Sequence, residues 1–431
     1  MTDTIFALSS GALPAGIAVI RISGPHAFAA VTTLAGELPA QRRASLRTLR
    51  CDGEVLDRAL VLIFPGPATA TGEDLAELHL HGGRAVVRAV EAALAAIPGL
   101  RGAEPGEFTR RALEHGRIDL TEAEGLGDLL AAETEMQRRT ALRAAEGGVR
   151  ARIEDWAARA LRLSALVEAI LDHGDEDDVA GEGDVLAVVQ NDASALAAEI
   201  EAVIAQPPVE RIRDGIRIVL AGSPNAGKST LLNALAGREA AIVSPLAGTT
   251  RDRIEVPVMR GGVAYLLTDT AGLHAAPADI VEEIGIARAR TAIEAADLVL
   301  WLDDAPLPPE LVGVPHLLIH PRADAAGRYV GPDERISVSA QTGQGIESLW
   351  DAIVRVTAAL LPPSDSVALN IRQRGLADQA ATALRAASGL HDLLLAAEEL
   401  RAALRAFHRI TGAADVEAML DTLFGRFCIG K

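Results

Sequence analysis

The pattern of hydrophobic and polar positions changes along the chain, and its first region is strand-like. Residues 1–117 contain short apolar runs separated by turn residues, among them "GIAVIRIS", "RALVLIF" and "LAELHLHG". Such short runs between turn signals are typical of β-strands. One segment, "RAVVRAVEAALAAI", has the apolar spacing of a helix instead. We predict an α+β domain with one helix here.

The remainder of the chain has a helical pattern that an alternating region interrupts. Residues 118–213 are rich in alanine, leucine and glutamate, and an acidic segment, "DHGDEDDVAGEGD", divides them. We interpret that segment as a solvated loop. Residues 214–362 alternate strands and helices, which predicts a parallel sheet. "LPPSDS" marks a linker, and residues 363–431, which begin within it, return to helix. The pattern predicts an α/β domain inserted into a helical domain.

Composition narrows the class of protein. A chain of 431 residues has room for two or three domains, and its two cysteines argue against a disulfide scaffold. "MTDTIFALSSG" lacks the features of a signal peptide, and no apolar run is long enough for a membrane span. We therefore expect a soluble cytoplasmic protein without a membrane partner. The net charge of −18 argues against broad electrostatic binding of nucleic acid, so any such contact needs a local patch or a partner.

The strongest chemical signal is a phosphate-binding loop. In "IRIVLAGSPNAGKSTLLNALAG", an apolar strand at Ile216–Leu220 is followed by Gly222 to Ser229 and then by a helical pattern. The glycines Gly222 and Gly227 let backbone N–H groups turn around phosphates, and the helix N-terminus adds its positive end. Lys228 can then reach the outer phosphates, and the Ser229 hydroxyl can bind Mg²⁺.

Three further motifs indicate a GTPase of the Ras-like type. "AGTTRD" supplies Thr250, whose hydroxyl can complete the Mg²⁺ shell. "LLTDTAG" ends a strand and supplies Asp269 on the metal side and Gly272 at the γ-phosphate. "ISVSAQTG" resembles the last guanine-side loop, with Ser339 and Ala340.

The position after "DTAG" departs from the common GTPase pattern. Leu273 stands where many GTPases have a glutamine that orients water. An apolar side chain cannot do this, so another residue has to. Nearby acidic candidates are Asp279, Glu282 and Glu283.

The guanine motif Asn-Lys-x-Asp departs as well. After the strand "PHLLIH" the chain has Pro321-Arg322-Ala323-Asp324. Asp324 can still accept hydrogen bonds from the guanine N1 and N2 groups, and Arg322 can cover the ring as a planar cation. The contacts of the asparagine are lost.

Long blocks outside these motifs resemble one family. They are "AGIAVIRISG", "TGEDLAELHLHGG", "PGEFTRRALEHGRIDLTEAEGLGDLLAAET" and the terminal "CIGK". Together with the inserted GTPase motifs, they resemble the MnmE (TrmE) family of tRNA uridine-5-carboxymethylaminomethyl modification GTPases over nearly the whole chain. The resemblance implies an N-terminal domain that binds folate and dimerises, and a helical domain interrupted by the G domain.

The resemblance also implies a flavoprotein partner, MnmG, which carries FAD. The two proteins install an aminomethyl-type group at C5 of the wobble uridine in certain tRNAs. The one-carbon donor is a tetrahydrofolate in its 5-formyl or 5,10-methylene form. Homodimerisation and a heterotetramer with MnmG are part of this expectation.

The resemblance implies a set of nucleotide and metal ligands. Mg²⁺ is expected at Ser229 and Thr250. K⁺ is expected at Asn225, Ser244, Leu246 and Thr249, where it would stand in for an arginine finger. Glu282 falls on the proposed catalytic glutamate, with Glu283 as a neighbour that stays open. The GTP ligands are expected to be Gly222, Asn225, Ala226, Gly227, Lys228, Ser229, Thr230, Ser244, Pro245, Leu246, Ala247, Gly248, Thr249, Thr250, Asp269, Thr270, Ala271, Gly272, Asp324, Ser339 and Ala340.

The folate pocket is expected at Arg21, Glu77, Arg117 and Lys431, with Cys428 close to the site of modification. A thiolate at Cys428 can add to C6 of uracil and activate C5, or assist one-carbon transfer; a buried helix-end cysteine is the alternative.

Several of these residues have a simpler structural interpretation. Glu77 could be a solvated strand carboxylate. The arginines at 110, 111 and 117 could form a solvated helix face, or they could bind the glutamyl carboxylates of folate or tRNA phosphates. His79 and His81 alternate on a strand, where a metal site would need further ligands. Cys51 is expected to be a buried apolar residue.

A second function class also fits the P-loop. An RNA-binding or ribosome-binding switch GTPase without modification chemistry would share the G domain but would have no reason to bind 5-formyltetrahydrofolate.

Overall fold

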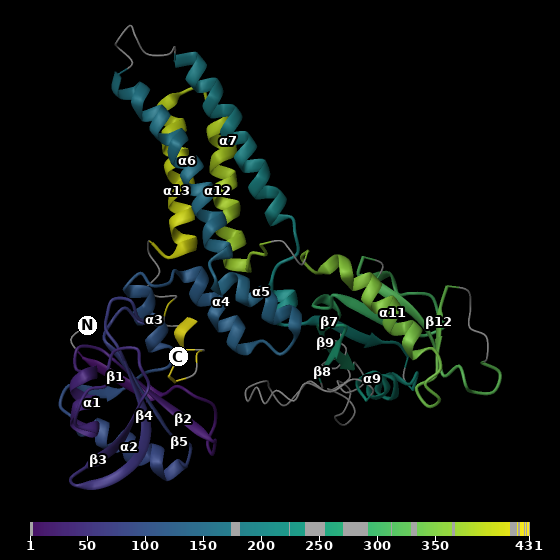
Figure 1. Ribbon diagram of the computed structural model, residues 1–431. Helices are drawn as coiled ribbons and strands as arrows, with labels where there is room; N and C mark the ends of the chain where they lie inside the picture. The colour runs from purple at the N-terminus through teal and green to yellow at the C-terminus, as the bar shows by residue number, and fades with distance from the viewer. Residues whose placement is uncertain are drawn as a thin grey trace, which may run out of the picture. The chain divides into compact units, whose positions relative to one another are not determined.

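The computed structural model describes residues 3–173, 182–223, 225–237, 255–269, 292–311, 313–328, 334–363, 367–413, 420, 423–425, 427 and 429–430. The chain divides into two compact units (Figure 1). The first consists of Met1–Gly127 and His408–Lys431, and the second of Asp128–Phe407.

The first unit is built on a mostly antiparallel six-stranded sheet in the order β3-β4-β5-β2-β1-β6. Only β6 runs parallel to its neighbour, β1. The strands are β1 (Thr4–Leu8), β2 (Ile17–Ser23), β3 (Ser45–Cys51), β4 (Glu54–Phe64), β5 (Leu75–His81) and β6 (Leu100–Gly102). The helices are α1 (Ala27–Ala35), α2 (Arg84–Ala95), α3 (Glu107–Glu114) and the start of α4 (Leu120–Ala131).

Alternation along the strands gives this sheet two different faces. Ile20 and Ile22 of β2 and Leu78 of β5 are buried in one core with apolar residues of α1 and α2. The intervening residues, such as Arg21 and Glu77, therefore lie on the opposite face. This second face is where polar chemistry is available.

The prediction of a single helix in this region was wrong. α1 and α3 also form, besides the predicted α2. α3 has few apolar residues, and what it buries includes the charged side chains of Glu107 and Arg111. A hydrophobic pattern cannot reveal a helix whose buried face is largely polar.

The end of the chain belongs to this first unit. Leu420, Phe424 and Phe427 pack in one cluster with Leu120 and Ala123 at the start of α4. The rings of Phe424 and Phe427 are tilted, with centroids 5.7 Å apart.

The second unit contains a helical bundle. In Figure 1, α6, α7, α12 and α13 run lengthwise beside one another. Buried alanines on α7 and α12, such as Ala193 and Ala380, keep side chains short where helices pack, and Trp156 meets Phe407 in the core. The helices are α5 (Glu135–Ala145), α6 (Gly148–His173), α7 (Glu182–Ile204), α8 (Glu210–Arg213), α12 (Ile371–Gly389) and α13 (Leu393–Thr411).

Capping boxes fix where two of these helices begin. The side chains of Thr134 and Asn370 each accept a hydrogen bond from the backbone N–H of a glutamine three residues later. The side chain of that glutamine in turn accepts a hydrogen bond from the backbone N–H of the capping residue. The glutamine of the first box, Gln137, also donates to the carbonyl oxygens of Ile212 and Arg213 at 3.1 and 2.9 Å. α5 thereby holds the segment that leads into the second sheet.

The second sheet is six-stranded in the order β12-β11-β10-β7-β9-β8, and only β8 is antiparallel to its neighbour. Leucines of α9 and α11 pack in one core with alternate residues of the sheet. The elements are β7 (Ile216–Ala221), α9 (Lys228–Ala236), β8 (Glu255–Arg260), β9 (Val263–Asp269), β10 (Leu298–Leu302), η2 (Pro309–Leu311), β11 (His316–Pro321), β12 (Ile336–Val338), α11 (Ile346–Thr357) and η3 (Ala358–Leu360).

The fold class is as predicted. The sheet from β7 to β12 stands in the sequence between α8 and α12, so an α/β domain interrupts a helical one. The exact boundaries at residues 117, 213 and 362 stay predictions. None of the described helices is both long and apolar enough to cross a membrane.

Candidate functional site

The turn after β7 has the backbone of a phosphate-binding loop. Gly222 has a φ of 147°, and a Cβ built on it would lie 2.4 Å from the carbonyl oxygen of Leu302. Gly227, with a φ of 96°, precedes the first residue of α9. Both positions require glycine, the first because β10 passes so close and the second because of its left-handed backbone. Asn225, between them, also has a positive φ of 61°.

Lys228 lies inside this loop. Lys228 is only 6% exposed, and its Nζ donates hydrogen bonds to the carbonyl oxygens of Gly222 and Ser223 at 3.0 and 2.9 Å. Burial lowers the pKa of Lys228, and the nearby carboxylates of Asp269 and Asp303 oppose this effect. The ammonium group is thus held at the centre of the loop.

A hydroxyl and a carboxylate meet beside Lys228. The Ser229 hydroxyl donates a hydrogen bond to Oδ2 of Asp269. The parallel pairing of β7 with β9 brings Asp269 level with Leu220, immediately before the loop. Because Mg²⁺ prefers hydroxyl and carboxylate oxygens, these two residues fit the predicted metal side.

The loop after β11 lies next to the P-loop. A Cβ built on Gly227 would be 3.8 Å from Cγ of Arg322, so the stem of Arg322 lies over that glycine. The Ala323 N–H donates to the carbonyl of Val338 at 3.0 Å. A hydrogen bond from Ser339 is the main cause that lowers the pKa of Asp324. Arg322, Asp324 and Ser339 are therefore gathered at one edge of the sheet.

Many predicted residues lie outside the described part of the chain. They are Ser244, Pro245, Leu246, Ala247, Gly248, Thr249, Thr250, Thr270, Ala271, Gly272, Leu273, Asp279, Glu282, Glu283, Cys428 and Lys431. Their roles stay predictions.

Two of the predicted folate ligands form a pair on the polar face of the first sheet. Arg21 and Glu77 face each other across β2 and β5. Nη2 and Nε of Arg21 lie 3.0 and 3.2 Å from Oε1 of Glu77, and Nε2 of His79 lies 3.3 Å from Oε2. Arg21 also lies over the ring of Phe108, with Cζ 5.9 Å from its centroid. Glu77 is therefore not simply a solvated carboxylate.

The third predicted folate ligand contacts a different segment. Nε of Arg117 donates to the carbonyl of Thr69, in the loop between β4 and β5, at 3.2 Å. Among the described residues, no hydrogen bond or ion pair joins Arg117 to Arg21 or Glu77. The first two residues thus contact each other directly, whereas Arg117 contacts the loop between β4 and β5.

Arg111 corrects the prediction of a solvated helix face. Its side chain is fully buried and forms ion pairs of 3.0 to 3.1 Å with Glu73, Asp3 and Glu107. Burial disfavours the charged carboxyl of Glu107, but hydrogen bonds from Arg101, Glu104 and Arg111 lower its pKa overall. Sequence reasoning missed this cluster because Asp3 and Glu73 are far from Arg111 in the chain, and only Glu107 stands at helical spacing from it.

Arg111 also supports the loop that Arg117 contacts. Oε2 of Glu73 accepts from Ser23 at 2.7 Å, and the hydroxyls of Ser23 and Thr71 are 2.7 Å apart. Ser23 lies two residues after Arg21 on β2, so it shares the polar face. The buried cluster and the predicted folate face are therefore continuous.

His81 pairs with a carboxylate, and Cys51 packs against the core of the first unit. Nδ1 of His81 lies 2.7 Å from Oδ1 of Asp57, and within the described residues no group of three or more metal-ligating side chains occurs. Cys51 was expected to be buried, but it is only partly buried at the end of β3, where it packs against the core.

The end of the chain reaches the edge of the polar face. Ile429 forms an antiparallel bridge with Pro105, and a Cβ built on Gly430 would lie 2.1 Å from the carbonyl oxygen of Leu8. Leu8 follows Ala7, which pairs with Arg21 in the register of β1 and β2. The chain end thus passes one residue away from the row that contains Arg21.

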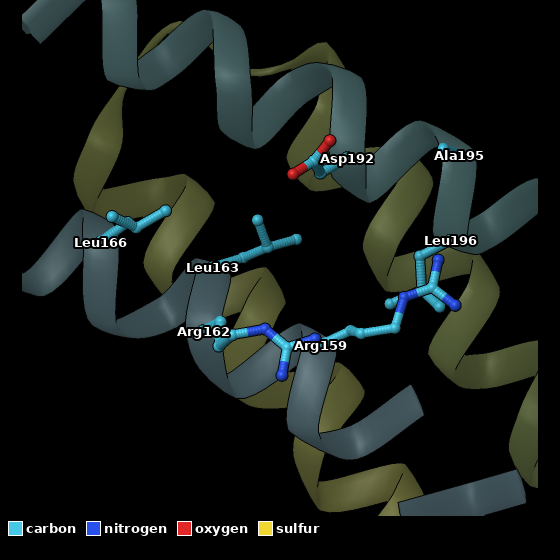
Figure 2. A pocket seen from close by; sticks show the side chains of 7 residues that line it. All are labelled: Arg159, Arg162, Leu163, Leu166, Asp192, Ala195 and Leu196. Carbon is cyan, nitrogen blue, oxygen red and sulfur yellow. The ribbon is translucent and has the colours of Figure 1, made fainter. Parts of the chain in front are cut away.

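The helical bundle has a separate groove of about 360 Å³ between α6 and α7 (Figure 2). It is lined by Arg159, Arg162, Leu163, Leu166, Asp192, Ala195 and Leu196. Arg159 is already paired with Glu199, with Nη1 2.6 Å from Oε2. None of the predicted site residues lies in this groove.

Comparison with known proteins identifies the family. The model of the GTP-binding protein TrmE N-terminus matches residues 4–117, and that of the MnmE helical domain matches residues 120–428. The chain belongs to the MnmE family. A relative from Rhizorhabdus wittichii, named tRNA modification GTPase MnmE, is 56% identical over 100% of this chain and 97% of its own length. A relative of the same name from Erythrobacter litoralis is 53% identical over the full length of both chains.

Solved structures resemble parts of the chain. The G domain of the T. maritima FeoB iron transporter is 26% identical, covering 33% of this chain and 98% of that chain, with a TM-score of 0.24. Era in complex with MgGDPNP and a 16S ribosomal RNA segment is 23% identical, covering 39% and 66%, with a TM-score of 0.26. The resemblance to MnmE drawn from the sequence motifs is thus confirmed by the family models and full-length relatives.

Proposed function

We propose that the chain is a K⁺-stimulated GTPase that, with the flavoprotein MnmG, modifies C5 of the wobble uridine in certain tRNAs. The added group is of the carboxymethylaminomethyl or aminomethyl type, and a tetrahydrofolate supplies the one-carbon unit. The observation that carries the proposal is the full-length match to relatives named tRNA modification GTPase MnmE.

GTP hydrolysis is assigned to the edge of the second sheet. Lys228 and the N–H groups around Gly222 and Gly227 would hold the phosphates. Ser229 and Asp269 would hold Mg²⁺, directly or through water, and Thr250 would complete its shell. The gathering of Lys228, Ser229 and Asp269 beside the loop supports these roles.

Asp324 would select guanine, because its two oxygens match the N1–H and N2 groups that adenine lacks. Ser339 supports this role because its nearby side chain lowers the pKa of the Asp324 carboxyl, which favours the charged acceptor.

K⁺ would supply positive charge that an arginine finger provides elsewhere. Asn225 lies on the P-loop with a left-handed backbone, which aims its side chain differently from an extended residue. The other expected ligands are Ser244, Leu246 and Thr249. Glu282 would orient the attacking water, since Leu273 cannot.

One-carbon chemistry is assigned to the polar face of the first sheet. Arg21 and Glu77 would bind the folate, with Arg117 and Lys431 as further ligands. The position of Ile429 beside Pro105 supports a role for the chain end, because Cys428 directly precedes it. Cys428 would act as the thiolate that activates the uracil ring.

The expected assembly is a homodimer that joins MnmG and tRNA, with FAD on MnmG. The alternative, a switch GTPase that binds RNA or ribosomes without modification chemistry, is less well supported because the N-terminal region matches the TrmE model over 4–117.

Binding of 5-formyltetrahydrofolate to the full chain, measured by calorimetry, tests the proposal against this alternative. We expect saturable binding that Glu77→Gln weakens. A chain that hydrolyses GTP but does not bind the folate would favour the switch GTPase.

A further inference from the structure

A buried histidine stands at the end of β11, directly before the altered guanine motif. His320 is 3% exposed. Its Nδ1 lies 2.6 Å from Oδ1 of Asp304, and its Nε2 lies 3.0 Å from the carbonyl oxygen of Arg328. The carboxylate and the carbonyl both accept hydrogen bonds, so each ring nitrogen of His320 faces an acceptor.

Arg328 closes the network. Its Nη2 donates to Oδ2 of Asp304 at 2.6 Å, and its Nε donates to the carbonyl of Pro321 at 3.3 Å. Burial works against the charged form of Asp304, but His320 and Arg328 outweigh it and lower the pKa of this carboxyl. The loop from Pro321 to Arg328 is therefore tied at both ends to one carboxylate.

This carboxylate is itself fixed to the nucleotide edge of the sheet. Asp303, its neighbour, accepts from the backbone N–H of Ser223 in the P-loop at 3.2 Å. Arg335 donates to the carbonyl oxygens of Asp304 and Ala305 at 3.3 and 2.8 Å. The segment after β10 thus links the P-loop to the loop after β11.

The tied loop carries the two residues expected to meet the base. Arg322 and Asp324 lie between its anchors, and Arg322 has a left-handed φ of 59°. A non-glycine residue in this region persists only when its surroundings hold it there. In place of the asparagine of the common motif stands Pro321, whose side chain cannot donate or accept a hydrogen bond.

We propose that Asp304, His320 and Arg328 form a positioning unit that replaces the missing asparagine and holds Asp324 and Arg322 against guanine. This inference rests on the proposed GTP-binding function and adds residues that set base specificity. The unit acts through the loop, and none of its three side chains is assigned a contact with the nucleotide.

The contacts within the unit explain why these three side chains occur together. A buried imidazole without partners would be costly, and Asp304 and Arg328 supply acceptors to both nitrogens of His320. Arg328 in turn pairs with the partly exposed Asp304 carboxylate. The loss of any one member should therefore disturb the loop rather than simply leave a gap.

Asp304→Asn tests the proposal, because it keeps the size of the side chain and removes its charge. We expect the dissociation constant for GTP, measured by calorimetry, to rise about tenfold, while kcat at saturating GTP changes less than about twofold. Preference for GTP over ITP, which lacks the N2 amine, should fall, because Asp324 would no longer be held in place. In an Asp324→Ala background, Asp304→Asn should add little.

Asp297→Asn is the matched control. Asp297 lies directly before the opposite end of β10, where it accepts from the Arg217 N–H at 3.0 Å. We expect it to leave the GTP to ITP ratio unchanged. If Asp304→Asn does not fold, Arg328→Met is the second variant, and the same shift in ratio is expected.

An unchanged GTP to ITP ratio in a folded variant of the unit would overturn the proposal, as would equal effects of Asp304→Asn and Asp297→Asn. Failure of the proposed GTPase function would look different, since the unaltered chain would then not prefer GTP to ATP.

Discussion

The two six-stranded sheets of this chain place their polar residues in different ways. In the mostly antiparallel first sheet, Arg21 and Glu77 lie on a face, at positions 56 residues apart that pair across two strands. In the mostly parallel second sheet, Lys228, Ser229 and Asp269 lie where strands end. The difference follows from strand direction. The carboxyl ends of parallel strands lie at one edge of the sheet, so polar residues can gather there. Antiparallel strands end at alternate edges, so polar residues gather on a face instead.

The comparison teaches why one site is easier to recognise than the other. A loop at a strand end is continuous in sequence, so its residues form a motif such as "GSPNAGKS". A face is assembled from alternate residues of several strands, and no short motif describes it. We therefore expect the two sites to be separable by mutation, so that a change that disables one site leaves the other working.

The largest expected effect is at the strand-end site. Lys228→Ala removes the one ammonium group at the centre of the P-loop, and we expect the rate of GTP hydrolysis to fall about 1,000-fold. Folate binding to the first sheet should be unchanged. Phosphate release assays on the variant and the unaltered chain give the measurement, and a rate within tenfold of the unaltered chain would be against the assignment.

The next largest effect concerns the buried cluster around Arg111, which is continuous with the polar face of the first sheet. Arg111→Leu leaves Glu73 buried without its cation and removes one of the two arginines that pair with Glu107, so we expect the free energy of unfolding of the first unit to fall by about 3–5 kcal/mol. Arg110→Leu is the matched control, because the ion pair of Arg110 with Glu114 is partly exposed. Its loss should cost no more than about 1 kcal/mol. Urea denaturation distinguishes the two, and equal costs would contradict a special role for Arg111.

A monovalent cation should act on the second sheet alone. GTP hydrolysis should be at least about tenfold faster in K⁺ than in Na⁺, since K⁺ would place charge against the phosphates in the transition state. Asn225→Ala should remove most of this difference. Folate affinity should not depend on which cation is present. Equal hydrolysis rates in the two salts would remove the cation site from the account.

The smallest expected effect is at the face of the first sheet. Arg21→Met removes a charged hydrogen-bond donor, so 5-formyltetrahydrofolate should bind about tenfold more weakly, with GTP hydrolysis unchanged. Arg58→Met, on β4 of the same sheet and separated from β2 by β5, is the control and should bind folate normally. If both variants bind equally well, Arg21 is a structural residue of the sheet.

Much of the second sheet could be predicted from the sequence because its signals are local. The strand before the P-loop was expected at 216–220 and forms β7, Ile216–Ala221. "LLTDTAG" was expected to end a strand at Asp269, as β9 does. Apolar strands, glycines and a helix start are adjacent there, so each supports the same interpretation.

The parts that could not be predicted depend on residues distant in sequence. Nothing near Arg111 reveals that Asp3 and Glu73 meet it, and nothing in "PHLLIHPRAD" reveals that Asp304 and Arg328 meet His320. The tertiary fold decides which polar groups meet, and the distances between these groups cannot be read from a single sequence.

The measurement that tests the account most directly is nucleoside analysis of tRNA by mass spectrometry. The tRNA would come from cells that lack their own member of the family. These cells would produce either the unaltered chain, the Lys228→Ala variant or the Arg21→Met variant. If both sheets serve one modification, the unaltered chain restores the aminomethyl-type group on wobble uridine. Lys228→Ala should then abolish it, and Arg21→Met should reduce it. Full modification by Lys228→Ala, or none by the unaltered chain, would contradict the account.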